Sequence, residues 1–412
     1  MSSGPSKIKV RACNRLLFTV LCGALQVYFF LSGIRVSTVS KCGKSPESPS
    51  IVLCNHGSFF DFLYAGMLLR KSYPHFIIAR LYFYHKWLRR LLTLLGGFPK
   101  SMFAMDVEST RNTLKVLRDG GVLAMMPEAR LSTVGKFEDI QESTYSFIKK
   151  ANVPVYTIQI HGSYLAKPKW GKGLRRGAVV ESEMDLLFTP EDLEMMSVDD
   201  IKKSIENRLY YDEFQWLQTR PEIHYHSRHL AEGLENILTI CPVCKQRHTI
   251  TTKNRDVFCE QCGKLTSLDS RYAFSSDFCF QNFAQWYEWQ KSVIEAQIAQ
   301  DPEYSLRSDV ELRLPSIDGK SFTRSAGHGV CTLDRNGLTY VGTRDGEPYE
   351  ISFSIKRVYR LLFGSGENFE IYDGSEILYF VPTERRSAVD WYLTSMILYD
   401  EALSKSTSAP QV

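Results

Sequence analysis

The sequence predicts an α/β fold, in which a mainly parallel sheet is flanked by helices. Three short apolar runs have the length of buried strands: Ile51–Cys54, Gly121–Met126 and Val153–Ile160. They alternate with three stretches of helical character: Phe60–Arg70, Ser109–Arg118 and Gln141–Ala151. Strands that alternate with helices are typical of parallel sheets, and functional side chains in such folds gather just beyond the C-terminal ends of the strands.

The bulk composition limits the class of protein. A chain of 412 residues exceeds one ordinary core, so we expect several domains. The formal net charge of +4 gives no global field for nucleic acid, and no nucleic-acid partner is expected. Four of the ten cysteines form two Cys-x-x-Cys pairs and the others are scattered, which favours a metal site in a reducing compartment over a disulfide framework.

A long apolar run, Leu16–Ile34, lies near the N-terminus. Its nineteen residues approach the length of a transmembrane helix, and a helix that lies within one leaflet is the alternative. A secretory signal would have a shorter apolar core and a cleavage site. Basic residues flank both ends, so the charges do not fix an orientation: Lys7, Lys9, Arg11 and Arg15 before the run, and Arg35, Lys41 and Lys44 after it. We expect a membrane-associated segment in residues 1–44.

The segment Ile77–Leu95 is rich in Leu and aromatic residues and contains four cations: Arg80, Lys86, Arg89 and Arg90. It is interpreted either as a packed amphipathic helix with a solvated basic edge or as an interfacial helix whose cations lie near anionic headgroups. The apolar run that precedes it in the sequence favours the interfacial helix.

His56 and Asp61 follow the first predicted strand. A neutral imidazole can remove a proton from a hydroxyl, and a nearby carboxylate fixes its tautomer and stabilises the imidazolium. Five positions exceed one helical turn, so we expect His56 on a loop and Asp61 in the first turn of the next helix. Gly57 and Ser58 allow the bend, and Ser58 is a candidate helix cap.

A second group of charged residues, Glu128 and Arg130, follows the second predicted strand within Pro127-Glu-Ala-Arg-Leu-Ser132. A guanidinium offers bidentate hydrogen bonds to a phosphate, and a carboxylate accepts from a hydroxyl or holds a neighbouring Arg. The alternative is a solvent-exposed ion pair.

A basic loop follows the third predicted strand and surrounds Trp170. Its five cations are Lys167, Lys169, Lys172, Arg175 and Arg176. They are candidates for binding a phosphate, the phosphates of an acyl carrier or a membrane surface, and Lys169 and Lys172 are the chosen substrate-binding residues. A solvated basic loop is the alternative.

The two Cys-x-x-Cys pairs predict a zinc site. Cys241 and Cys244 precede Cys259 and Cys262 by a spacer of fourteen residues, and four thiolates complete a tetrahedral Zn²⁺ shell. We expect a structural zinc ribbon, because the four sulfurs leave no open position for catalysis.

The C-terminal region predicts antiparallel strands. Alternating runs begin near Val310 (VELRL, GLTYV, YEISF, VYRLLF, NFEIY and EILYFV) and are separated by Asp-Gly or Asn-Gly turns. An amphipathic helix at 386–403 follows. This order suggests a small β-barrel-like domain of pleckstrin-homology-like shape with a final helix.

Four blocks follow one another along the chain: NHGSFFD at 55–61, GGFPKS at 96–101, PEARLS at 127–132 and VPV at 153–155. In content, order and spacing they resemble the glycerolipid acyltransferase family, typified by 1-acyl-sn-glycerol-3-phosphate acyltransferase, over about residues 15–215. The resemblance implies that His56 and Asp61 form a charge-relay pair and that Glu128 and Arg130 bind a phosphate-bearing acceptor.

Two further positions are judged against the same family. Asn55 is a further substrate-binding candidate, and Lys100 stands two positions before the family's phosphate-contacting Arg. The family's usual Glu-Gly-Thr-Arg is Glu-Ala-Arg-Leu here.

The implied function is that of an O-acyltransferase. It would move a fatty acyl group from acyl-CoA or acyl-carrier protein to a lysophospholipid, with 1-acyl-glycerol-3-phosphate as the first candidate. The alternatives are another lyso-lipid or alcohol acceptor, or a catalytically silent membrane scaffold. We expect membrane association with the catalytic domain on the cytoplasmic side. The expected segments are 1–44 (membrane-associated), 45–235 (acyltransferase), 236–270 (zinc ribbon), 271–309 (helical linker) and 310–412 (β-rich domain with the last helix).

Overall fold

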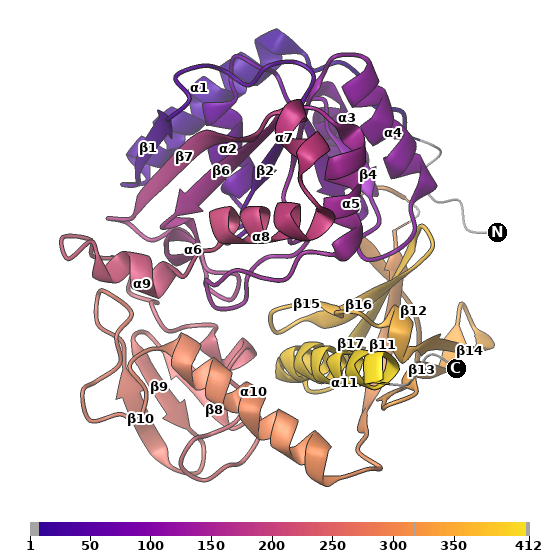
Figure 1. Cartoon of the computed structure of the whole chain (residues 1–412). Coiled ribbons are helices and arrows are strands. Elements are labelled where there is room, and N and C mark those ends of the chain that lie inside the picture. The colour runs from indigo at the N-terminus through magenta and orange to yellow at the C-terminus, as the bar shows by residue number, and fades with distance from the viewer. Residues whose placement is uncertain (1–7, 317, 409–412) are drawn as a thin grey trace. The chain divides into compact units, whose positions relative to one another are not determined.

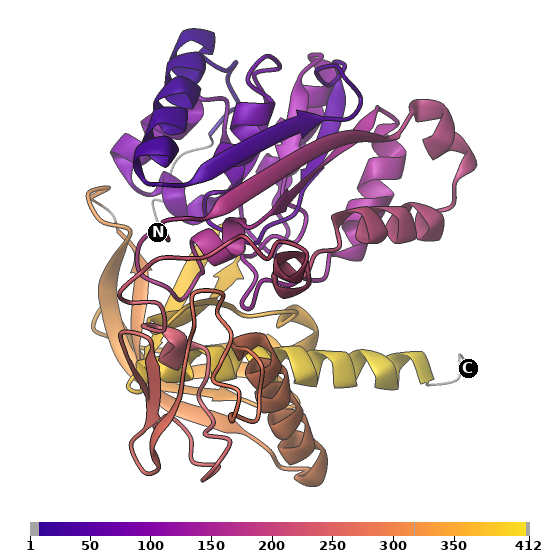
Figure 2. The same cartoon turned by 90° about the vertical axis from the view of Figure 1, so that its left-hand side faces the viewer.

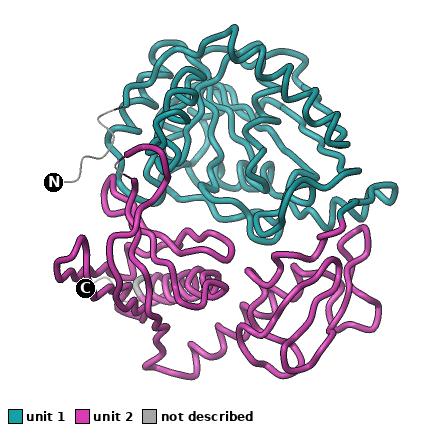
Figure 3. The backbone as a smooth tube through the Cα atoms, turned by 180° about the vertical axis from the view of Figure 1, so that it is seen from behind, with its two compact units in different colours: residues 1–227 teal, residues 228–412 magenta. Residues whose placement is uncertain are grey.

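The computed structural model describes residues 8–316 and 318–408 of the chain. The basic residue Lys7 lies outside the described residues. The chain divides into two compact units, residues 1–227 and 228–412, which are coloured separately in Figure 3. The expected division into five segments stays a prediction.

Unit 1 is built on a seven-stranded sheet of order β1-β7-β6-β2-β5-β3-β4 (Figure 1). Its strands are β1 (Arg35–Ser40), β2 (Ser50–Cys54), β3 (His75–Ala79), β4 (Phe98–Lys100), β5 (Val122–Met125), β6 (Val155–His161) and β7 (Val179–Phe188). All neighbours are parallel except β6 and β7, so the predicted mixed α/β fold with a mainly parallel sheet is confirmed. Every residue of β2 is buried, as a strand covered on both faces requires.

Helices and short turns precede, connect and follow these strands. They are α1 (Arg15–Leu31), α2 (Asp61–Leu68), η1 (Arg80–Phe83), α3 (Lys86–Leu94), α4 (Val107–Arg118), α5 (Glu142–Ala151), α6 (Ser163–Ala166), α7 (Pro190–Met195), α8 (Val198–Leu209) and α9 (Glu213–Gln218). Figures 1 and 2 show β1 beside β7 in the sheet. One large core cluster joins β2, β5 and β6 to α4, α5 and α8. Helix α2 contacts β1, β6 and β7 and also packs on α1.

The segment Ile77–Leu95 is not a single helix, so both interpretations of it were wrong in that respect. It contains the end of β3, the 3₁₀ turn η1 and the short helix α3. The β-branched pair Ile77 and Ile78 lies in β3 and pairs in parallel with β4. Arg80 is 2% exposed and bonds to Asp106, and therefore does not face a headgroup region.

Unit 2 begins with a small antiparallel sheet of order β10-β9-β8. Its strands are β8 (Ile250–Lys253), β9 (Asp256–Cys259) and β10 (Gly263–Ser267), and the 3₁₀ turn η2 (Leu234–Asn236) precedes them. Helix α10 (Phe283–Gln300) follows, and the Asn282 side chain caps it by accepting from two backbone N–H groups.

The rest of unit 2 is a seven-stranded antiparallel sheet of order β14-β13-β12-β11-β17-β16-β15. Its elements are β11 (Leu306–Pro315), β12 (Thr323–Leu333), β13 (Gly337–Arg344), β14 (Glu347–Ser354), η3 (Ile355–Arg357), β15 (Leu362–Gly364), β16 (Asn368–Asp373), β17 (Glu376–Pro382), η4 (Arg385–Ser387) and α11 (Ala388–Ser408). The predicted strand VYRLLF is wrong over most of its length, because only Leu362–Phe363 are paired.

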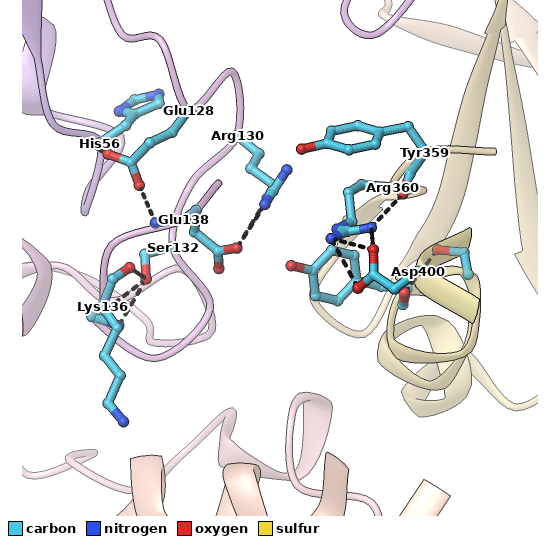
Figure 4. Close-up of polar contacts among 12 residues, drawn as sticks. His56, Glu128, Arg130, Ser132, Lys136, Glu138, Tyr359, Arg360 and Asp400 are labelled. Atoms are coloured by element: carbon cyan, nitrogen blue, oxygen red, sulfur yellow. Dashed lines mark hydrogen bonds and ion pairs between the residues drawn. The ribbon is translucent and has the colours of Figure 1, made fainter. Parts of the chain in front are cut away.

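Two contacts fix α11 within unit 2. Trp391 is fully buried, and its ring stacks on Phe369 with centroids 4.2 Å apart. The Arg360 guanidinium donates to the Asp400 carboxylate at 3.1 Å and lies 4.7 Å from the centre of the Tyr359 ring (Figure 4). These contacts attach the last helix to the loop before β15 and to β16.

Candidate functional site

Strand β2 positions the first group of candidate residues. It lies between β5 and β6 and ends at Cys54, so Asn55 and His56 emerge beyond its C-terminal end. The fully buried Asn55 amide donates to the Ile160 carbonyl at 2.8 Å, and its oxygen accepts from the Ile160 N–H at 2.7 Å. Both ends of this amide bind the main chain of β6 and hold the start of the His56 loop against that strand.

His56 and Asp61 face each other. The imidazole Nδ1 lies 3.3 Å from the Asp61 Oδ2, and the two side chains are 20% and 0% exposed. Asp61 is the first residue of α2, where the helix dipole favours a negative charge, and His56 is on the preceding loop as expected. The same Oδ2 accepts from the Ser58 N–H at 2.8 Å. With Nδ1 directed at the carboxylate, Nε2 is the ring nitrogen that can accept a proton.

The expected Ser58 cap is wrong. The residue that precedes α2 is Phe60, and no side chain caps the helix. The Ser58 hydroxyl instead donates to the Lys167 carbonyl at 3.0 Å. Ser58 therefore ties the His56 loop to the chain beyond β6.

Glu128 lies beyond the end of β5 and is fully buried. Its Oε1 accepts from the His56 N–H at 2.7 Å, and its Oε2 accepts from the Glu138 N–H at 2.8 Å. Figure 4 shows the carboxylate between these two loops. Burial raises the pKa of Glu128 well above its ordinary value of 4.5, although the two N–H groups oppose the rise. Glu128 joins the loop after β5 to the loop after β2.

Arg130 pairs with Glu138, a residue that the sequence did not single out. Its Nε and Nη2 both lie 3.0 Å from the Glu138 Oε2. Figure 4 shows the Arg130 guanidinium directed at the Glu138 carboxylate. Arg130 is 7% exposed, and its guanidinium lies 5.8 Å from the centre of the Phe103 ring. The intervening Ala129 has φ +57°, a left-handed conformation that favours glycine, at the position where the resembling family has Gly.

Lys100 ends β4, and burial lowers its pKa. A buried ion pair lies next to it. The Arg80 guanidinium donates to the Asp106 carboxylate at 2.8 Å and to the Ser101 hydroxyl at 3.0 Å. Asp106 also caps α4 by accepting from the Ser109 N–H. This cluster fixes the β4–α4 turn.

The loop at 167–176 does not present five cations around an exposed Trp. Trp170 is 4% exposed, and its indole N–H donates to the Tyr164 hydroxyl at 2.9 Å. Arg175 is 1% exposed and donates to the Lys172 carbonyl and to the Ser227 hydroxyl. Lys172 is exposed and Lys169 is partly buried. The buried Trp170 and Arg175 organise the loop, so a ligand would meet fewer cations than expected.

An apolar cleft adjoins the helix that carries Asp61. The space between its lining residues, counted together with the open solvent at its mouth, is about 450 Å³, and the cleft lies among α1, α2, α3 and β3. Its lining residues are apolar and include Phe18, Leu25, Phe62, Ile78 and Leu92. One of its lining residues, Phe62, directly follows Asp61 in α2.

The four predicted cysteine ligands lie together. The ligand atoms of Cys241, Cys244, Cys259 and Cys262 are all within 4.8 Å of one another. Cys241 and Cys262 have sulfurs 3.9 Å apart, and Cys244 and Cys259 have sulfurs 3.7 Å apart. A tetrahedral zinc ion with Zn–S bonds of about 2.3 Å separates neighbouring sulfurs by about 3.8 Å, so this set fits the ion.

Buried side chains hold the first cysteine pair against the rest of unit 2. The Asp390 carboxylate accepts from the Thr239 hydroxyl at 2.7 Å and lies 2.7 Å from the His248 Nε2. The Gln290 oxygen accepts from the Thr239 and Ile240 N–H groups. His248 thus contacts α11 rather than the four sulfurs.

The structure brings His56, Asp61, Glu128 and Arg130 into one network, together with the unpredicted Glu138. Lys100 belongs to the β4 end, and Lys169 and Lys172 belong to the loop after α6. Glu138 was missed because it stands in a loop without periodicity, and its spacing from Arg130 matches no family block.

Part of unit 1 is similar to known proteins. Residues 33–161 match the model of the acyltransferase family. The chain is 20% identical over 159 residues to the 1-acyl-sn-glycerol-3-phosphate acyltransferase of Bacillus subtilis (strain 168), a match that covers 38% of this chain and 77% of that protein. It is also similar to the crystal structure of the 1-acyl-sn-glycerophosphate (LPA) acyltransferase PlsC from Thermotoga maritima, with a TM-score of 0.36 and 18% identity over 47% of this chain and 78% of that chain. Residues 33–161 of this chain are therefore similar to the acyltransferase family.

Proposed function

We propose that the protein transfers a fatty acyl group from a thioester donor, acyl-CoA or acyl-carrier protein, to the hydroxyl of a lysophospholipid. The first candidate acceptor is 1-acyl-glycerol-3-phosphate, which would yield phosphatidate. The observation that carries the proposal is the His56–Asp61 pair, with Nδ1 3.3 Å from a fully buried carboxylate and a partly exposed ring. Its position within the family match supports catalysis over a structural ion pair.

The pair supports general-base catalysis. Asp61 accepts from Nδ1–H and holds the imidazole in one tautomer, and Nε2 takes the proton of the acceptor hydroxyl. The hydroxyl oxygen attacks the thioester carbonyl, the C–S bond breaks, and the departing thiolate receives the proton from Nε2. No nucleophile of this chain is required, because the acceptor oxygen attacks directly.

The apolar cleft beside α2 supports a long acyl chain as one of the reacting groups. Its lining would remove methylene groups from water, at about 0.8 kcal/mol for each buried CH₂. The cleft lining includes Phe62, the residue after Asp61, which suits an acyl chain whose carbonyl lies near His56.

A second candidate acceptor is a lyso-lipid without a phosphate monoester, or another alcohol. The observation in its favour is that Glu128 binds two backbone N–H groups and Arg130 binds Glu138, so both predicted acceptor ligands serve internal contacts. Lysophosphatidate would have to compete with Glu138 for the Arg130 guanidinium.

An acceptor screen tests the function. Purified protein is incubated with oleoyl-CoA or oleoyl-carrier protein and, separately, with lysophosphatidate, a lysophospholipid with a substituted phosphate, and a long-chain alcohol. Mass spectrometry reads the products. We expect phosphatidate from lysophosphatidate, whereas a product only from another acceptor would support the second candidate. No acylated product from any acceptor would favour a catalytically silent scaffold.

We further propose that the protein associates with membrane lipid through α1, with the catalytic unit on the cytoplasmic side. Among the described residues, no helix combines the length and apolarity that a membrane crossing requires. Helix α1 nevertheless exposes large apolar side chains, including Leu16 (76%), Phe30 (78%) and Leu31 (74%). An interfacial helix buries such side chains at the headgroup boundary. Sedimentation with anionic vesicles tests this, and a Phe30→Asp, Leu31→Asp variant that still sediments equally would contradict it.

The four-cysteine cluster is proposed to hold one structural Zn²⁺ in a zinc ribbon, because its sulfur spacings fit the ion and its four ligands fill the shell. The seven-stranded sheet and α11 are proposed to form a pleckstrin-homology-like domain. Its two antiparallel meanders, joined by the β11–β17 pairing and followed by a helix, support that assignment.

A further inference from the structure

One short segment of unit 1, Tyr211–Glu213, contacts the loop after β5 and the turn after β6. The Tyr211 carbonyl accepts from the Phe137 N–H at 3.0 Å, and the Glu213 N–H donates to the Gly135 carbonyl at 2.8 Å. The segment therefore lies along the loop that carries Arg130 and Glu138. It stands fifty residues beyond the family match, which ends at residue 161.

The Tyr211 ring lies between the loops of His56 and Glu128. Tyr211 is 1% exposed, and its hydroxyl is 3.5 Å from the Glu128 Oε2, the outer limit of a hydrogen bond. A Cβ added to Gly57 would lie 3.5 Å from the same ring. The ring therefore leaves little space for the residue after His56 to move.

Glu213 is a buried carboxylate, 1% exposed, that binds a turn of the backbone. Its Oε1 accepts from the Gly162 N–H at 3.0 Å. Gly162 has φ +77°, and a Cβ there would lie 2.0 Å from the Val179 carbonyl oxygen, so the turn requires glycine. The His161 Nδ1 lies 3.7 Å from the same Oε1, and the His161 ring stacks on Trp216.

The turn held by Glu213 leads directly into the support of the His56 loop. Gly162 precedes α6, and a Cβ on Gly57 would lie 3.2 Å from the Tyr164 Cβ in that helix. At the end of α6, the Lys167 carbonyl accepts from the Ser58 hydroxyl. Gly57 and Ser58, which contact α6 and its end, directly follow His56.

We propose that Glu213 is a positioning residue for His56, acting through Gly162, α6 and Ser58, and that Tyr211 completes this support by filling the space between the two loops. The proposal rests on the proposed acyltransferase function, in which His56 is the general base. Without the Gly162 contact, α6 would lose its fixed start and the His56 loop would lose its support. Misplacement of a catalytic group by about 1 Å can reduce a rate by about 10²-fold.

The acceptor oxygen of residue 213, rather than its charge, supplies this contact, because a backbone N–H is the donor. Glu213→Gln keeps an oxygen of the same reach, whereas Glu213→Ala removes it and leaves a buried N–H unpaired. Glu181→Ala is the matched control. Glu181 accepts from the neighbouring Trp216 indole N–H and pairs with Arg220, but makes no contact with Gly162.

The experiment has two readouts. Acyl transfer gives kcat and the KM values for donor and acceptor. The nitrogen NMR signal of the His56 imidazole, assigned by its loss in His56→Gln, reports whether the ring still holds its tautomer. We expect Glu213→Ala to lower kcat by about tenfold or more with KM within about threefold, and to change the His56 signal. Glu213→Gln and Glu181→Ala should stay within about threefold of wild type in kcat and keep the signal.

A folded Glu213→Ala protein with an unchanged His56 signal overturns the proposal whatever its kcat, and so does a Glu213→Gln protein as impaired as Glu213→Ala. If Glu213→Ala does not fold, Ser58→Ala decides, because it removes only the hydroxyl bond to Lys167. An altered His56 signal in Ser58→Ala supports the proposal, and an unaltered one overturns it. A wild-type protein that acylates no acceptor contradicts the proposed function alone, since the His56 signal still tests the positioning role.

Discussion

The two candidate sites of this chain are held together by different means. The His56 site is assembled from segments far apart in sequence, 55–61, 128–138 and 211–213. The Glu128 carboxyl group joins the first two by accepting from the His56 N–H, and backbone hydrogen bonds join the third to the second. The four cysteines lie within 22 residues, and their sulfurs approach one another without any strong bond among themselves. The first site is therefore a product of the fold, whereas an ion at the second would stabilise the fold around it.

The largest effect should come from removing a cysteine ligand. Cys259→Ser should lower bound zinc from about one ion per chain to none, with a loss of several kcal/mol of local stability. Hydrogen exchange should speed up in residues 236–268 but not in residues 33–161. Cys279→Ser, an exposed cysteine outside the cluster, is the control. Retained zinc, or equal loss of protection in both regions, would contradict the contrast between the sites.

Glu128→Gln should cost about 1–3 kcal/mol in stability at low pH, because the amide can accept from only one of the two N–H groups. Since burial raises the pKa of Glu128, the folded protein binds a proton more tightly than the unfolded chain, and wild-type stability falls as pH rises above 4.5 toward the folded pKa. The glutamine variant lacks this loss. Urea unfolding over that range should show the gap between the two proteins narrowing as pH rises. A widening gap would contradict the buried carboxylate.

Arg130→Ala should raise the acceptor KM by about tenfold with a smaller change in kcat, if the acceptor displaces Glu138 on the guanidinium. A tenfold rise in KM corresponds to about 1.4 kcal/mol of binding free energy. Arg220→Ala, which removes an exposed ion pair with Glu181, is the control. An unchanged KM for lysophosphatidate would assign Arg130 a structural role only.

The smallest effect is expected at Ala129, whose φ of +57° strains a residue with a Cβ. Ala129→Gly should stabilise the protein by up to about 1 kcal/mol, since the left-handed conformation costs an L-residue about 1–2 kcal/mol and glycine loses more backbone entropy on folding. The rise in unfolding temperature of Ala129→Gly over wild type measures this gain in stability. A destabilised variant would show that the backbone there is not strained.

The sequence predicted the strands that position the site because β2, β5 and β6 are short apolar runs. Their length and composition indicate buried strands without any knowledge of tertiary contacts. It failed at Ile77–Leu95, where an aromatic-rich stretch with cations reads as amphipathic although His75–Ala79 pairs in the sheet. It also missed β12, whose Gly327 and Gly329 lower strand propensity. The structure gives the reason for these glycines, since a Cβ at Gly327 would lie 1.9 Å from the Thr343 carbonyl.

The candidate site was predictable to the level of the family blocks and not beyond. His56 and Asp61 are close in sequence, and a loop followed by a helix was enough to bring them together. The partners of Glu128 and Arg130 depend on how the loop at 132–138 folds back, which no local pattern encodes. Trp170 looked like part of a surface site because its neighbours are basic, but its indole lies in the core of the loop.

The central claim, that His56 is the general base of an acyltransferase, is tested most directly by His56→Ala. The variant should retain the wild-type unfolding temperature, because the imidazole is 20% exposed and its Nδ1 contacts the Asp61 carboxylate at a distance of 3.3 Å. Acyl transfer to the acceptor found in the screen should fall by about 10²–10⁴-fold, the usual contribution of a general base. A folded variant that forms the acylated product at the wild-type rate would contradict the assignment.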